Sequence, residues 1–158
     1  MRPRDRAGDT YGVALALANI LRIDASRIAV LGISHGGHTA VEVTRKAFQA
    51  AYPGLIKASV NYYGNCHDPR QHGTIPLLIL VGDADTWGGA ASCKRYVAAL
   101  DPGLPVELKI YPGVVHASEY TRQSPAYSEG HPLEYDPAAA AGSFVRTRAF
   151  LAHWLDHG

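Results

Sequence analysis

A serine flanked by glycines is the feature of this chain that points most directly to chemistry. Residues 32–36 read G-I-S-H-G, a G-x-S-x-G pattern. Residues 27–31 ahead of it are short, apolar and partly β-branched, which predicts a buried strand, and residues 38–48 behind it are long enough for a helix. A G-x-S-x-G pattern between a strand and a helix is typical of a nucleophile elbow. The sequence therefore predicts that Ser34 is a nucleophile.

The predicted turn also gives roles to the neighbours of Ser34. The turn is too sharp for side chains on both flanks of the serine, so we expect Gly32 and Gly36 to relieve the crowding. The backbone N–H of His35 is then placed to donate to an oxyanion.

A serine nucleophile needs a base, and the base needs an acid to orient it. The apolar run 75–81 is followed at once by Asp83 and Asp85. A carboxylate just past the end of a buried strand lies at the active-site edge of an open α/β sheet. The next predicted strand, 106–111, leads to His116 at the same edge. Of the eight histidines, only His116 follows a strand at this point in the chain, so we predict it as the base.

Three blocks of the sequence resemble the dienelactone hydrolase family of α/β-hydrolases: residues 27–37, 76–85 and 106–116. They occur in the family's order, and the resemblance extends over nearly the whole chain. It implies hydrolysis of a carboxylic ester or lactone through an acyl-enzyme, with no metal and no organic cofactor. Founding members of the family use cysteine as nucleophile, so the serine favours an esterase-like member.

The resemblance also implies the site residues. Ser34 corresponds to the nucleophile and His116 to the base. Asp85, the last residue of a Gly-x-x-Asp segment, is favoured over Asp83 as the orienting acid. A peptidase of the related prolyl-oligopeptidase group has the same order of residues, but no propeller or gating domain accompanies this sequence.

Members of the family begin with several strands and helices that this sequence does not show. A loop of that region supplies the second oxyanion donor, so His35 is the one donor that the sequence offers. Losing one such donor costs about 2.7–4 kcal/mol of transition-state stabilisation. The alternative function is therefore a catalytically impaired remnant that acts through self-association or a partner chain.

The difference from the family at the N-terminus also affects the expected assembly. Without an N-terminal neighbour, the predicted strand from Arg27 to Leu31 lies at an exposed sheet edge, and such edges are usually paired or covered. We expect a homodimer across this edge, or a partner chain on it.

The order of predicted elements favours an α/β fold, a three-layer α/β/α sandwich with about four parallel strands. The resemblance implies a truncated α/β-hydrolase fold, and residues 1–158 are expected to form a single domain. Arginines at positions 2, 4 and 6 are expected to lie in a solvated or frayed terminus. We predict strands over residues 27–31, 57–63, 77–81 and 106–111, and helices over 11–22, 34–52, 90–100 and 136–156.

Composition limits the partners. Fifteen basic and fourteen acidic side chains give a net charge of +1 without a basic stripe, so we expect a small-molecule substrate and neither nucleic acid nor membrane as partner. No secretory leader opens the sequence, which favours a cytoplasmic location. His67, Asp68 and His72 are metal-ligand types, but their spacing matches no metal signature, so no metal site is predicted.

Loops at the predicted catalytic edge supply candidates for substrate binding: Tyr63, Cys66 and Trp87. Tyr120, Tyr127 and Tyr135 either line an acyl or aromatic pocket with Trp87 or only pack their own loop. Cys66 and Cys93 form a disulfide or remain two buried thiols, since sequence separation does not establish the geometry.

Overall fold

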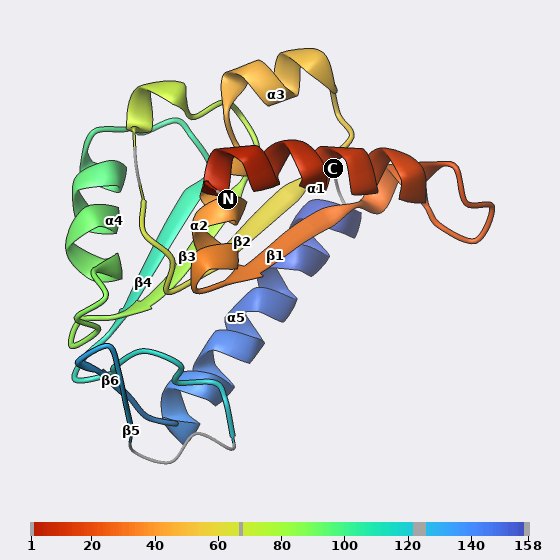
Figure 1. Ribbon diagram of the computed structural model, residues 1–158. Coiled ribbons are helices and arrows are strands. Elements are labelled where there is room, and N and C mark those ends of the chain that lie inside the picture. The colour runs from red at the N-terminus through yellow and green to blue at the C-terminus, as the bar shows by residue number, and fades with distance from the viewer. Residues whose placement is uncertain (1, 67, 122–125, 157–158) are drawn as a thin grey trace.

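A four-stranded parallel sheet forms the centre of the computed structural model, which describes residues 2–66, 68–121 and 126–156 (Figure 1). The spatial order of the strands is β1-β2-β3-β4, so each connection leads to the neighbouring strand. The fold class is α/β, as predicted. The strands are β1 (Ala29–Ile33), β2 (Ala58–Tyr62), β3 (Leu77–Gly82) and β4 (Val106–Tyr111).

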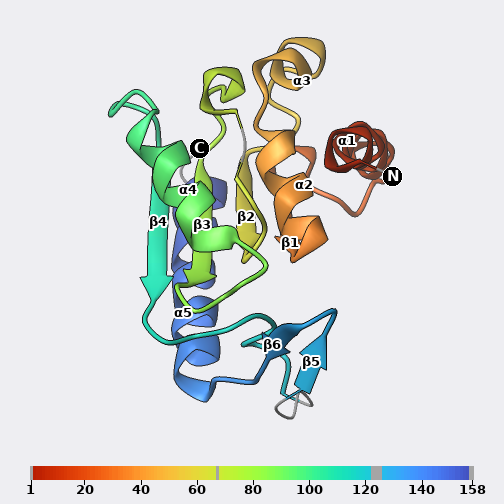
Figure 2. The ribbon, with the colours of Figure 1, turned by 60° about the vertical axis from the view of Figure 1, so that its left-hand side comes forward.

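Helices cover both faces of this sheet. The helices α2 (His35–Val43) and α4 (Gly89–Ala98) lie on one face, and α5 (Pro137–Asp156) crosses the other (Figure 2). All six residues of β3 are buried, and Tyr96 of α4 and Phe150 of α5 pack into the same core. This apolar centre fixes the sheet, whose C-terminal edge carries the predicted site.

The first helix, α1 (Pro3–Ala18), begins eight residues earlier than predicted. Pro3 takes a first-turn position that suits proline, and the Arg2 backbone N–H donates to Asp5. Ala7 and Tyr11 have no exposed surface and pack with residues of α2 and its flanking loops, so the terminus is not frayed. Arg2, Arg4 and Arg6 are exposed, which agrees with the solvated alternative. The helix ends four residues early because Asn19 caps it, its side chain donating to the Leu15 carbonyl at 2.8 Å.

The helix predicted over 34–52 is two helices, α2 and α3 (Lys46–Ala51). The break follows from the bonds of Thr44. Its hydroxyl donates back to the Val41 carbonyl at 2.7 Å, and its own carbonyl accepts from the N–H of Gly73 at 2.8 Å. The helical ladder therefore loses an acceptor at Thr44, and the chain restarts as α3 at a new angle.

The segment after His116, for which neither a strand nor a helix is predicted, contains a short antiparallel pair, β5 (Ala126–Ser128) and β6 (His131–Leu133). Glu129 and Gly130 join the two strands with positive φ angles of 52° and 83°, which two-residue hairpin turns favour. The N–H of Glu134 donates to the His116 carbonyl at 3.2 Å, so this hairpin is bonded to the segment that carries His116. Two 3-10 turns, η1 (Ala25–Arg27) and η2 (Pro69–Gln71), complete the described elements.

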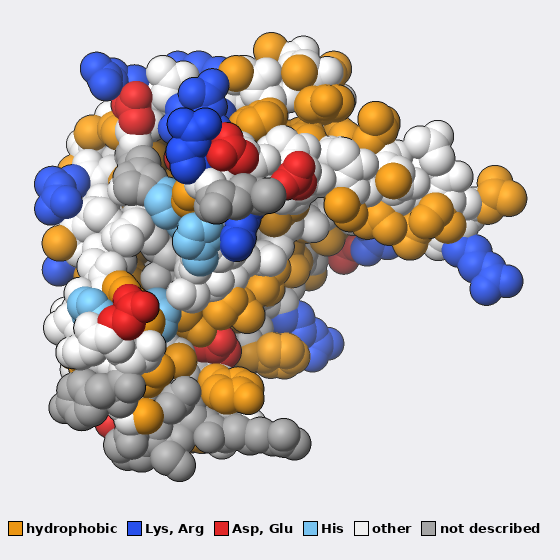
Figure 3. All heavy atoms as spheres, in the orientation of Figure 1, with side chains coloured by type: hydrophobic (Ala, Val, Ile, Leu, Met, Phe, Trp, Pro, Cys, Tyr) orange, Lys and Arg blue, Asp and Glu red, His pale blue; other side chains and the backbone are white. Residues whose placement is uncertain are grey.

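An apolar surface runs along β1 and α1. β1 is an edge strand, and its Leu31 and Ile33 are 47% and 46% exposed. Hydrophobic side chains also gather along the second half of α1 and the turn after it (Figure 3): Val13, Leu15, Leu17, Ile20, Leu21 and Ile23. The exposed edge is where the sequence places it, while the homodimer or partner chain stays a prediction. Within the described parts of the chain, no helix combines the length and apolarity needed to cross a membrane.

Candidate active site

Ser34 lies in the turn from β1 into α2, with φ 55° and ψ −117°. This left-handed backbone is unusual for a residue with a side chain, and such strain is concentrated at functional sites. The Ser34 N–H donates to the Tyr62 carbonyl at 2.9 Å, which fixes the turn to β2.

The glycines that relieve crowding around Ser34 are not the two that the sequence predicted. A Cβ on Gly32 would lie 1.9 Å from the Gly36 carbonyl oxygen, so the turn requires glycine at 32. A Cβ on Gly36 would meet nothing within 4 Å, so the expected role of Gly36 was wrong. The second close approach is at Gly37, where a Cβ would lie 2.3 Å from Asn61 Oδ1 because α2 packs directly on β2.

His116 lies between Ser34 and Asp85. Its Nε2 is 2.9 Å from Ser34 Oγ, and its Nδ1 is 2.8 Å from Asp85 Oδ2. His116 and Asp85 are 5% and 6% exposed, so water competes little for these bonds. The structure thus brings together the three residues that the sequence predicts, in the order carboxylate, imidazole, hydroxyl.

The two candidate aspartates have different positions. Asp83 is exposed, and its Oδ1 accepts from the Gly113 N–H at 2.7 Å across the turn after β4. Asp85 is the residue in contact with His116, and its Oδ1 accepts from the backbone N–H of Trp87 at 2.9 Å. The geometry therefore favours Asp85 as the orienting acid.

A cavity of about 240 Å³ opens beside Ser34 and His116. Two aromatic rings lie edge-on to the imidazole, with centroid distances to His116 of 4.4 Å for Tyr63 and 4.7 Å for Trp87. None of the described lining residues is Asp, Glu, Lys or Arg. The lining comprises Ser34, His35, His38, Tyr63, Gly64, Asn65, Trp87 and His116.

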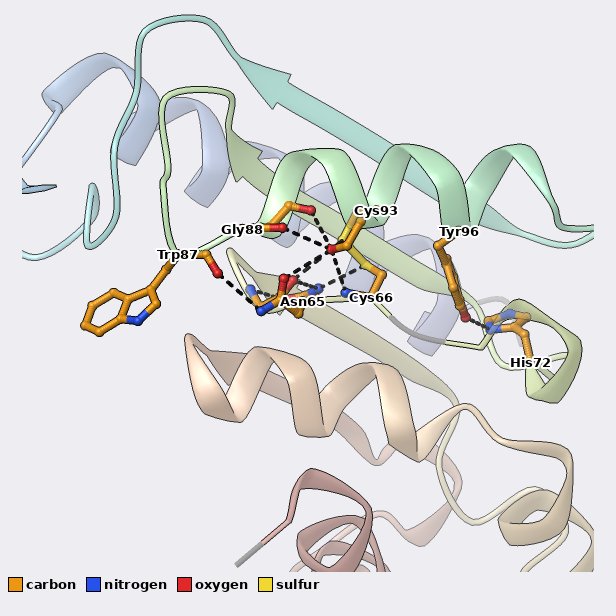
Figure 4. Close-up of a disulfide and its surroundings, with 11 residues drawn as sticks. Asn65, Cys66, His72, Trp87, Gly88, Cys93 and Tyr96 are labelled. Atoms are coloured by element: carbon orange, nitrogen blue, oxygen red, sulfur yellow. Dashed lines mark hydrogen bonds between the residues drawn. A yellow bond between two sulfur atoms is a disulfide. The ribbon is translucent and has the colours of Figure 1, made fainter. Parts of the chain in front are cut away.

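Of the predicted site residues, Tyr63, Trp87 and His35 line this cavity, and Cys66 does not. The Cys66 sulfur is bonded to Cys93, with the two Cα atoms 4.8 Å apart, so the cysteines form a disulfide rather than two free thiols (Figure 4). Tyr120 and Tyr135 are also absent from the lining, and the side chain of Tyr127 lies outside the described part of the structure.

The sequence interpretation missed His38, Asn65 and Glu119. His38 lies three residues after His35, so the helical period places both on one face of α2. This spacing could have predicted that His38 lies near the site. Asn65 and Glu119 lie on irregular segments, where no periodicity predicts which way a side chain points.

Glu119 is bonded to Tyr63 of the cavity wall, whose hydroxyl donates to Glu119 Oε1. Burial, together with this bond, raises the pKa of Tyr63 far above its usual range, so the phenol keeps its proton at any physiological pH. Glu119 Oε2 is buried and has no hydrogen-bond partner among the described residues. Tyr63 also has a φ of 42°, a second strained residue at this edge of the sheet.

The residues of metal-ligand type that the sequence contains near position 70 have other partners where the structure describes them. Asp68 pairs with Arg70, and buried His72 contacts Tyr96 and Thr44, while His67 lies outside the described residues. In the described parts of the chain, no group of three or more His, Cys, Asp or Glu side chains is arranged to hold a metal ion.

Comparison with known proteins gives a family match. The model of the dienelactone hydrolase family matches residues 4–155. No curated protein matches the chain significantly.

Solved structures share the fold at low sequence identity. A proposed dienelactone hydrolase from Klebsiella pneumoniae has 22% identity and a TM-score of 0.72, with 94% of this chain and 60% of that chain covered. A dienelactone hydrolase-like promiscuous phosphotriesterase from metagenomic libraries has 20% identity and a TM-score of 0.68, with 96% and 61% covered. Esterase 2 of Thermogutta terrifontis, phosphorylated by paraoxon, has 16% identity and a TM-score of 0.70, with 97% and 65% covered. This chain therefore spans less than two thirds of the length of each of these structures.

Proposed function

The chain belongs to the dienelactone hydrolase family, and we propose that it is a serine hydrolase that cleaves a carboxylic ester or lactone. The family and the esterases of the same fold support a hydrolase. The observation that carries the finer proposal is the continuous contact from Asp85 through His116 to Ser34, at 2.8 and 2.9 Å.

In the acylation step, Ser34 Oγ attacks the carbonyl carbon of the substrate while His116 Nε2 takes the hydroxyl proton. Asp85 holds Nδ1 of the ring, which fixes the tautomer and stabilises the imidazolium. The carbonyl oxygen becomes an oxyanion, and the backbone N–H of His35, the first residue of α2, donates to it. His116 then protonates the leaving alcohol as the carbon–oxygen bond breaks.

In the deacylation step, His116 takes a proton from water, and the hydroxide attacks the acyl-enzyme. The tetrahedral intermediate collapses to the carboxylic acid, and the proton returns to Ser34. The disposition of the three residues allows both steps without a change of partner.

The cavity favours a small, uncharged substrate. Aromatic walls at Tyr63 and Trp87 suit an apolar acyl group, and no Lys or Arg among the described lining residues would pair with a substrate carboxylate. A volume of about 240 Å³ suits a short acyl chain better than a long one.

Reaction with a fluorophosphonate tests the proposal, because the reagent modifies an activated serine whatever the natural substrate. We expect one adduct per chain, mapped to Ser34, and hydrolysis of p-nitrophenyl acetate that is lost in Ser34→Ala. Ser26→Ala, at an exposed serine of η1, is the matched control and should label like the wild type. A folded wild-type protein that neither labels nor hydrolyses the ester would overturn the proposal and favour the impaired remnant.

A further inference from the structure

The loop that follows β2 is covalently joined to α4 beside the cavity (Figure 4). The disulfide connects Cys66, in this loop, with Cys93, in the second turn of α4. Cys66 is 5% exposed and Cys93 is fully buried, so the bond lies inside the protein and not in the cavity wall. Any effect on the site must therefore pass through neighbouring residues.

Ser92 makes the first of these connections. Its hydroxyl oxygen accepts from the Cys66 backbone N–H at 3.2 Å and lies 3.2 Å from Asn65 Oδ1. The hydroxyl proton is shared among the Asn65 oxygen and the carbonyls of Gly88 and Gly89 at the start of α4. The side chain of Asn65 is thus oriented by contacts that exist only while the loop lies against α4.

Asn65 makes the second connection, to the cavity wall. Its Nδ2 donates to the carbonyl of Trp87 at 3.3 Å, and both residues line the cavity. The indole of Trp87 stacks on His131, with ring centroids 4.9 Å apart, and lies edge-on to His116. The Trp87 wall therefore depends on the amide of Asn65 at its backbone.

Gly88, the residue after Trp87, also contacts Asn65. Gly88 has a φ of 106°, and a glycine in this region samples backbone angles that other residues avoid. A Cβ at Gly88 would lie 3.2 Å from Asn65 Oδ1, so Asn65 packs directly on this peptide. Loss of Asn65 would therefore remove both a hydrogen bond and a packing contact from the Trp87–Gly88 segment.

We propose that the Cys66–Cys93 disulfide and Asn65 are positioning residues that hold Trp87 in the cavity wall and so determine how tightly the acyl group binds. This inference rests on the proposed function, since it concerns the substrate of that site. It assigns no chemical step to the disulfide. It predicts an effect on KM rather than on the reaction of Ser34.

The test compares Asn65→Ala, the double variant Cys66→Ala/Cys93→Ala, and the triple variant that combines them. With p-nitrophenyl butyrate, we expect each of the first two to raise KM about fivefold, the size of one neutral hydrogen bond's contribution, with little change in kcat. The triple variant should raise KM no further, because all three changes remove the same restraint. Asn19→Ala is the matched control, since within the described residues that amide bonds to the Leu15 carbonyl of α1, and its KM should equal that of the wild type.

Fluorophosphonate labelling separates failure of this inference from failure of the proposed function. A wild type that does not label contradicts the function itself. Variants that label at the wild-type rate but keep the wild-type KM overturn the positioning role, as would a lower melting temperature with KM unchanged. An additive rise in the triple variant would also overturn it, because disulfide and amide would then act separately.

Reduction of the wild-type protein gives a second measurement if the double variant does not fold. Dithiothreitol transfers two electrons to the disulfide, which becomes two thiols while the reagent closes into its own cyclic disulfide. The reduced protein should show the raised KM of Asn65→Ala, and reduction of Asn65→Ala itself should change nothing more. A reduced wild type with unchanged KM, verified by thiol titration, would contradict the proposal.

Discussion

The backbone N–H of Trp87 donates to Oδ1 of Asp85, two residues earlier, while Oδ2 of the same carboxylate faces His116. One short turn after β3 therefore does two things. It fixes the orientation of the carboxylate by a bond to its own backbone, and it places the indole against the imidazole. The orientation of the proposed acid and the position of the Trp87 side chain are therefore linked through this turn.

Replacing Asp85 by asparagine tests its assignment. The amide fills the same space, but its NH₂ group cannot accept from Nδ1–H, so the imidazole is held in the wrong tautomer. We expect kcat to fall by about 10⁴, as for the equivalent change in serine proteases, with a smaller change in KM. Steady-state hydrolysis of p-nitrophenyl acetate measures both. Asp83→Asn is the control and should lose less than tenfold, and equal losses in the two variants would contradict the assignment.

The two glycines after His35 should differ sharply. Gly37→Ala forces a Cβ to 2.3 Å from Asn61 Oδ1 and 2.6 Å from the Tyr62 carbonyl oxygen, both held in β2. We expect this change to cost about 2–4 kcal/mol of unfolding free energy or to prevent folding. Gly36→Ala meets nothing and adds helix propensity, so it should be neutral or stabilising by up to about 1 kcal/mol. Urea unfolding of the two variants measures both free energies. A Gly36 variant as unstable as the Gly37 variant would contradict this prediction.

The parts of the fold that the sequence predicted are those set by local pattern. The apolar run at 77–81 and the alternation of elements were enough for the parallel sheet and its layers. The proximity of Ser34, Asp85 and His116 could be predicted because each follows a strand, and strand ends meet at one edge of a parallel sheet.

The parts that failed depend on contacts between distant residues. The sequence near Thr44 does not show that the Gly73 N–H will donate to the Thr44 carbonyl and so end α2. The sequence near Ala7 does not show that packing on α2 will bury Ala7. For the same reason the sequence did not decide whether Cys66 and Cys93 form a disulfide. The two residues are 27 apart in sequence and meet through the packing of α4 on the sheet. Boundaries and caps are thus decided by tertiary contacts that a single sequence does not show.

Tyr63 and Glu119 should behave as a coupled pair. Tyr63→Phe keeps the ring against His116 but leaves the half-buried Glu119 carboxylate without its donor, so we expect a loss of about 1–3 kcal/mol in unfolding free energy. Adding Glu119→Leu removes the unpaired charge and should recover part of that loss. A double-mutant cycle from chemical denaturation gives the coupling. A double variant less stable than Tyr63→Phe alone would contradict this prediction.

The exposed edge of β1 leads us to predict a homodimer. The strand presents unpaired backbone groups with Leu31 and Ile33 half-exposed, a surface that a second copy covers by continuing the sheet. Light scattering of the purified chain should give twice the mass of one chain, and Leu31→Lys should halve it. Ala98→Lys, at an exposed position of α4 outside this apolar surface, is the control and should leave the mass unchanged. A wild type that remains monomeric across micromolar concentrations would contradict the dimer.

His72 should make the stability of the protein depend on pH. Its ring is 2% exposed, with Nδ1 2.6 Å from the Tyr96 hydroxyl and 2.8 Å from Thr44 Oγ1, and Nε2 has no partner among the described residues. Burial, and then the charge of Lys46, lower the pKa of His72 to about 4. Glu42, Arg45 and Asp68 line the small cavity beside it and complete the charged surroundings.

The sign follows from which state binds the proton. Below about pH 6.5 the unfolded chain protonates His72 while the folded protein does not until about pH 4, so stability is fully present at neutral pH and is lost between these values. We expect His72 to contribute a loss of about 2–3 kcal/mol between pH 7 and pH 4.5. Urea unfolding of the wild type and of His72→Gln at both pH values isolates this part, because the other titrating groups are common to both proteins. If the two proteins lose the same stability on acidification, His72 is not held neutral by burial.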